Sequence, residues 1–96
     1  SLKNTAKVEI FGQVYTIKGD ADPEYITELA NYVDLQMKEV SKKHPNSSIS
    51  KVSILAALGI ANEVFKLKEK ERNNNQILEE KTKVLVEMLN KEVGIT

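Results

Sequence analysis

The chain has 96 residues, of which 41% are hydrophobic and only 5% aromatic, and it contains no Cys and no Trp. Fourteen basic residues balance fourteen acidic ones, so the formal net charge is zero and no basic excess favours nucleic acid or an anionic membrane surface. The length allows one small domain, the absence of Cys excludes a disulfide framework or a thiolate metal site, and no apolar run approaches the roughly 18 residues that membrane insertion as a helix requires.

Residues 7–18 are expected to form a β-hairpin. β-branched and aromatic residues flank Gly12-Gln13, and Gly at the first central position favours a two-residue type II′ turn. That turn would place Phe11 opposite Val14 near the tip. It would also put four apolar side chains on one face, which we expect to be buried: Val8, Ile10, Tyr15 and Ile17. An isolated hairpin is marginally stable in water, so this face must lie on a helix or join another hairpin.

A medium helix is expected at about residues 23–43. Asp22 supplies the N-cap and Pro23 suits the first helical position. Pro45 disfavours the helical conformation at His44 and ends the helix. Apolar residues at helical spacing give it a single stripe, formed by Ile26, Leu29, Ala30, Val33, Met37 and Val40.

A long helix is expected from about residue 49 to about residue 93, with Ser48 or Ser50 as its N-cap. No Pro interrupts it, and Gly59 is its only Gly. At a rise of 1.5 Å per residue it would be roughly 65 Å long, more than the rest of the chain could cover. Because an amphipathic helix must bury its apolar side, the sequence predicts self-association.

The long helix changes character along its length. Its first part is apolar over a wide arc, residues 68–76 are almost wholly polar, and its last part carries two adjacent apolar seams. Two seams favour a bundle of more than two helices, and we expect four. The residues expected to mediate oligomerisation are Ile54, Leu58, Ala61 and Phe65 in the first part, and Ile77, Leu78, Val84, Leu85, Met88 and Leu89 in the last.

Three consecutive asparagines, Asn73, Asn74 and Asn75, leave one alternative open. Asn is a poor helix former, so this run could be a turn that folds the chain end back as a third helix in a compact domain. The run contains no Gly or Pro, and Asn is tolerated in coiled coils, where it fixes the register. We therefore expect one continuous helix.

The sequence shows no pattern that predicts catalysis, a cofactor or a metal site. His44 is the only histidine and lies at a helix end, while Asp34 is a single carboxylate on a helix, for which salt bridging or solvation is the simpler explanation. The glycines form no phosphate-binding loop. At the expected hairpin tip, Phe11 and Val14 are either ordinary exposed apolar residues or a contact with another protein.

Three segments, in order, resemble the ZapA family of bacterial cell-division proteins. They are Val8-x-Ile10-Phe11-Gly12-x-x-Tyr15-x-Ile17, Tyr25-Ile26-x-x-Leu29-Ala30-x-x-Val33-Asp34-x-x-Met37, and the run from Ser53 to Glu63. They are similar to that family's hairpin, first helix and start of the long helix. The resemblance covers about residues 8–67, and the rest matches only as a coiled-coil-like helix. Gly59 departs from the family pattern, which often has Asn there.

The resemblance implies an α+β fold with a globular head, residues 1–67, and a coiled-coil tail, residues 68–96. It implies dimers through the heads and tetramers through antiparallel association of the long helices. It further implies a non-enzymatic, cytoplasmic factor at the midcell division site that binds FtsZ and cross-links its protofilaments, promoting the Z-ring. Contact residues are then expected at the hairpin tip, namely Phe11, Gln13 and Val14. The alternative is a generic coiled-coil adaptor with another protein partner.

Overall fold

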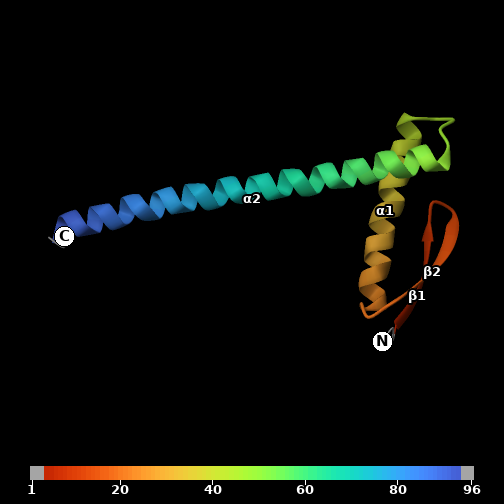
Figure 1. The fold of residues 1–96 in the computed structure, drawn as a ribbon, viewed down its shortest axis with the longest axis horizontal. Coiled ribbons are helices and arrows are strands. Elements are labelled where there is room, and N and C mark those ends of the chain that lie inside the picture. Colours follow the sequence, from red (N-terminus) through yellow and green to blue (C-terminus); the bar gives the residue numbers. More distant parts are fainter. Residues whose placement is uncertain (1–3, 94–96) are drawn as a thin grey trace. The chain divides into compact units, whose positions relative to one another are not determined.

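The computed structural model describes residues 4–93, which form two strands followed by two helices (Figure 1). These elements are β1 (Asn4–Ile10), β2 (Gln13–Gly19), α1 (Pro23–Lys43) and α2 (Ile49–Val93). The predicted α+β class, with a hairpin, a medium helix and a long helix, is confirmed.

The chain divides into two compact units, one ending at Ala61 and the other beginning at Asn62. We call the first unit the head and the second the tail. The expected division between residues 67 and 68 lies slightly further along α2. The outer ends of the expected head and tail, residues 1–3 and 94–96, lie outside the described residues.

The hairpin is antiparallel, and its turn differs from the predicted one. Ile10 pairs with Gln13, so Phe11 and Gly12 are the central residues, with φ of 51° and 81°. Positive φ at both positions is the type I′ pattern, whereas we predicted type II′ with Gly12-Gln13 at the centre. The predicted pairing of Phe11 with Val14 is therefore wrong, because Val14 lies opposite Glu9.

The first strand also begins earlier than predicted, at Asn4 instead of Lys7. The Asn4 side-chain amide donates hydrogen bonds to the carbonyl oxygens of Asp20 (3.3 Å) and Ala21 (3.1 Å). These bonds tie the start of β1 to the loop that leads into α1. The extension brings Ala6 into the core, where it is 5% exposed.

The core of the head consists of two small clusters. In the first, Ala6 and Val8 of β1 pack against Ala30 of α1, with Ile10 and Ile26 beside them. Small alanines on both elements allow the strand to lie close to the helix. The second cluster joins α1 to the first turns of α2 and contains Met37, Val52 and Ala56, flanked by Ile10, Phe11, Val33 and Val40.

The predicted helix boundaries are confirmed at both ends of α1 and at the start of α2. The Asp22 carboxylate accepts a hydrogen bond from the Glu24 N–H at 3.0 Å, and Pro23 opens the helix. The His44 N–H donates to the Val40 carbonyl oxygen at 2.9 Å and closes it. Of the two candidate caps for α2, Ser48 has this role, because its hydroxyl accepts from the Lys51 N–H at 3.1 Å.

The asparagine run does not interrupt α2, which is helical through Asn73, Asn74 and Asn75. The alternative of a turn and a third helix is therefore wrong. None of the helices in residues 4–93 is both long enough and apolar enough to cross a membrane.

Two glycines give a matched pair of stability predictions, because a Cβ added at Gly12 or at Gly59 would meet no atom within 4 Å. Gly59 is helical, so Gly59→Ala should raise the free energy of unfolding by about 1 kcal/mol. Gly12 has a φ of 81°, so Gly12→Ala should lower it by roughly 1–2 kcal/mol. Urea denaturation of both variants shows whether each substitution raises or lowers the free energy of unfolding. A loss for Gly59→Ala would instead show that a second copy packs closely there.

Candidate functional site

One chain buries few large apolar side chains. Among the described residues six apolar side chains are buried, and three of these are alanines, whereas twenty large apolar side chains are exposed. Single exposed apolar residues are ordinary on any folded protein. A surplus of this size marks surfaces that associate with other proteins. These side chains include two groups, one in a groove on the head and one along the tail.

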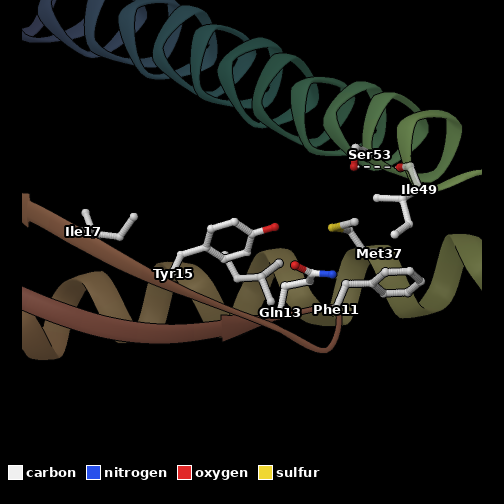
Figure 2. A pocket seen from close by; sticks show the side chains of 8 residues that line it. Phe11, Gln13, Tyr15, Ile17, Met37, Ile49 and Ser53 are labelled. Atoms are coloured by element: carbon white, nitrogen blue, oxygen red, sulfur yellow. Dashed lines mark hydrogen bonds between the residues drawn. The ribbon is translucent and has the colours of Figure 1, made fainter.

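The head carries an apolar groove of about 500 Å³ between the hairpin and the first turns of α2 (Figure 2). Its lining residues are Ile10, Phe11, Gln13, Tyr15, Ile17, Met37, Ile49 and Ser53. None of them carries a charge. The Ser53 hydroxyl donates to the Ile49 carbonyl oxygen at 2.8 Å within its own helix. Such a lining suits apolar side chains of a partner and offers no general acid, base or nucleophile pair.

The groove exists because only one strand of the hairpin packs fully on α1. Val8 and Ile10 of β1 share a face with Tyr15 and Ile17 of β2, as predicted, since Val8 pairs with Tyr15 and successive side chains alternate. Val8 is 5% exposed, but Tyr15 is 47% and Ile17 is 40% exposed. The prediction that all four are buried is therefore confirmed for Val8 alone, because Ile10 is half-buried and the β2 pair is exposed and remains available to a partner.

The three residues expected at the hairpin tip do not form one surface. Phe11 is half-buried, and its side chain packs beside the cluster of Met37, Val52 and Ala56. Gln13 lines the groove. Val14 is 67% exposed and lies on the other face of the hairpin, because it is adjacent to Gln13 along the strand. Phe11 thus connects the hairpin to both helices.

Asp34 of α1 binds the backbone of Phe11 and so connects the hairpin to this helix. Its Oδ1 accepts a hydrogen bond from the Phe11 backbone N–H at 2.7 Å, and its Oδ2 lies 2.8 Å from the Lys38 ammonium. The expectation of a salt-bridging carboxylate is confirmed. The Lys38 ammonium, followed by the Phe11 N–H, lowers the pKa of Asp34 below its ordinary 3.8, and Asp34 in turn raises the pKa of Lys38.

This lowered pKa predicts how stability depends on pH. A carboxylate with a lower pKa in the folded state stabilises the fold above its unfolded pKa, and this contribution is lost as the pH falls through the folded pKa. The stability advantage of the wild type over Asp34→Asn should therefore be constant above about pH 5. It should shrink as the pH falls below 3.8. Urea denaturation of both proteins across this range checks the direction, and an advantage that grows in acid would contradict it.

In the head, the residues of α2 that face the core are not those expected to mediate oligomerisation. Val52 and Ala56, one helical turn apart, are 1% and 2% exposed. Ile54 and Leu58 point elsewhere and are both 62% exposed, and Ala61 is also exposed. The i, i+4 spacing of Val52 and Ala56 was the signal that could have identified the inward side.

In the tail, the expected seams lie on a helix that no other described part of the unit covers. Phe65 and all six seam residues are exposed, the seam residues being Ile77, Leu78, Val84, Leu85, Met88 and Leu89. A single helix cannot bury its own apolar side. The tail therefore has the form of a helix that requires partners, with residues 68–76 as a helical polar stretch between apolar ones.

The described residues show no other arrangement that would perform chemistry. No three His, Asp or Glu side chains in residues 4–93 lie together in a group that could hold a metal ion. His44 is exposed at the end of α1, where its backbone caps the helix. Asp34 is engaged by Phe11 and Lys38. The groove on the head and the exposed apolar side of the tail are thus the candidate functional site.

Comparisons with known proteins give matches over most of the chain. The family model described as cell division protein ZapA matches residues 6–93. ZapA from Geobacillus kaustophilus is 41% identical over 80 residues, covering 82% of this chain and 88% of the relative. ZapA from Bacillus licheniformis is 37% identical over 78 residues, covering 80% of this chain and 92% of the relative.

Two solved structures share the fold. A dimer of a ZapA mutant from Geobacillus stearothermophilus matches with a TM-score of 0.61 and 38% identity, over 82% of this chain and 92% of that one. A conserved bacterial protein from Pseudomonas aeruginosa matches with a TM-score of 0.78 over 93% of this chain and 99% of that one. The second is 23% identical and supports the fold alone.

Proposed function

This chain belongs to the ZapA family of cell division proteins, and from that membership we propose that it binds FtsZ and cross-links its protofilaments, promoting the Z-ring. The observation that carries the proposal is the surplus of exposed apolar side chains on the groove and the tail, with no catalytic constellation beside them. We propose that it acts without catalysis, in the cytoplasm at the midcell division site.

The proposed assembly uses two surfaces. The head groove associates with a second copy to give a dimer, in keeping with the dimer formed by the Geobacillus stearothermophilus ZapA mutant. The tail seams associate in antiparallel fashion to give a tetramer. An assembly that presents several heads holds more than one filament, because linking weak sites raises the effective concentration of the second contact.

Of the three hairpin-tip residues expected to contact FtsZ, Phe11, Gln13 and Val14, we propose Val14 as the contact, because Phe11 and Gln13 line the groove that the second copy occupies. The Val14 side chain is accessible for this role, because it is 67% exposed on the face away from the groove. A head dimer formed through the groove would leave this face open. The net charge of zero favours a contact that depends on shape and specific pairs over bulk electrostatic attraction.

Co-sedimentation with FtsZ filaments tests the function. The wild type should increase the fraction of FtsZ pelleted at low speed, because bundles sediment faster than single protofilaments. Val14→Ser should reduce this increase, and Thr5→Ala, at the other end of the same hairpin face, should leave it unchanged. No effect of the wild type on FtsZ would favour the alternative of a coiled-coil adaptor with another partner. If Val14→Ser bundles FtsZ as well as the wild type does, the tip contact is rejected, but the proposed function is not.

A further inference from the structure

We propose that Asp34 is a positioning residue for self-association, which acts through Phe11 on the shape of the apolar groove. Its carboxylate keeps the hairpin turn in the conformation in which the Phe11 side chain completes the groove, and the occupant of the groove is a second copy of this chain. The inference rests on the head dimer of the proposed function and deepens it, since Asp34 is not a lining residue of the groove.

The hairpin turn has a conformation that its own residues do not favour. Phe11 has a φ of 51°, a left-handed conformation that bulky residues rarely adopt and that type I′ turns usually fill with Asn, Asp or Gly. Local propensity therefore opposes the observed turn. Something outside the hairpin must stabilise it.

Asp34 supplies that stabilisation across 23 residues of sequence. Its two oxygens have separate partners, because Oδ1 accepts from the Phe11 N–H while Oδ2 pairs with Lys38. The Asp34 side chain is 18% exposed, whereas that of Lys38 is 59% exposed. The hydrogen bond to Phe11 is charge-assisted and shielded from water on the Asp34 side, and such bonds are about twice as strong as neutral ones.

Phe11 belongs both to the turn and to the lining of the groove. The Phe11 side chain lies at the end of the groove opposite Ile17, close to Met37 and below Ile49 (Figure 2). Its direction follows from the backbone at the same residue. If the Phe11 backbone left the left-handed conformation, the ring would leave this end of the groove and the lining would lose a wall.

The matched variants are Asp34→Ala, which removes the acceptor, Asp34→Asn, which retains an acceptor oxygen without charge, and Lys38→Met, which removes only the ion pair. Sedimentation equilibrium of the full chain measures the concentration at which the head dimer half-dissociates. Asp34→Ala should raise this concentration about tenfold or more, because a hydrogen bond to a charged group is lost. Asp34→Asn and Lys38→Met should each stay within about threefold of the wild type, as expected for a neutral hydrogen bond and an exposed ion pair.

Amide hydrogen exchange of the Phe11 N–H provides a site-specific second readout. It should accelerate in Asp34→Ala and stay protected in Asp34→Asn, while the amides of β1 remain protected in both. If Asp34→Ala unfolds the head, the Asp34→Asn variant becomes the deciding one. If Asp34→Asn associates as weakly as the unfolded Asp34→Ala chain, the proposal is overturned.

A groove variant separates this inference from the proposed function. Ile17→Glu places a charge on the groove directly. If Ile17→Glu leaves the half-dissociation concentration unchanged, the groove is not an association surface and the proposed head dimer fails. If Ile17→Glu weakens association but Asp34→Ala does not, the head dimer stands and the positioning role of Asp34 is refuted.

Discussion

Replacing both Leu85 and Leu89 with Glu should reduce the assembly from a tetramer to a dimer while the head stays folded. These side chains are 57% and 54% exposed on one side of α2, so no packing within the described part of the chain depends on them. In the proposed tetramer each buried Leu contributes about 1.5–3 kcal/mol. A carboxylate in its place adds a desolvation cost of several kcal/mol. Because about 1.4 kcal/mol changes an association constant tenfold, the tetramer should be undetectable at micromolar concentration.

A matched control introduces the same charge on the other side of the helix. At about 100° per residue, Gln76 and Asn90 lie on the side away from Leu85, and both are exposed. The variant Gln76→Glu/Asn90→Glu should remain tetrameric. Sedimentation equilibrium gives the masses, and circular dichroism checks the helix content. A tetramer that survives Leu85→Glu/Leu89→Glu would show that the seam lies elsewhere on α2.

What the sequence predicts well in this protein is local. Both ends of α1 follow from Asp22, Pro23 and the Pro after His44. Ser48 caps α2 by accepting a hydrogen bond from an N–H only three residues further along the chain. These features depend on contacts between near neighbours in sequence, so a pattern of residue types is enough to place them. The same holds for α2 across its asparagine run, where the absence of Gly and Pro decided correctly between a helix and a turn.

What the sequence predicts poorly depends on distant contacts. The turn at Phe11-Gly12 could not be inferred from local propensity, because Asp34 and the Met37 cluster stabilise a conformation that Phe disfavours. The shift in register preserved which side chains share a face, because two residues correspond to one full repeat of the strand. Burial of that face was overestimated, since only β1 lies against α1. Whether Tyr15 and Ile17 face a partner is a property of the assembly.

The second prediction concerns the head and uses the tail variant as its background. In the full chain carrying Leu85→Glu/Leu89→Glu, a further Ile17→Glu should convert the remaining dimer into a monomer. Ile17 is 40% exposed at the edge of the groove, so one chain tolerates Glu there, because the carboxylate can reach water. In a head dimer the same carboxylate would be buried without a partner, which costs several kcal/mol for each copy.

Thr16→Glu in the same background is the matched control, because Thr16 is the adjacent residue of β2 and its side chain lies on the opposite face of the hairpin. It should leave the dimer intact. A mass that falls for Ile17→Glu alone identifies the groove as the dimer surface. A dimer that persists in both variants would instead assign dimerisation to the exposed side of α2, where Ile54 and Leu58 lie away from the Val52 and Ala56 core. Either the groove or the exposed side of α2 could form the dimer, and the substitutions at Ile17 and Thr16 distinguish the two surfaces.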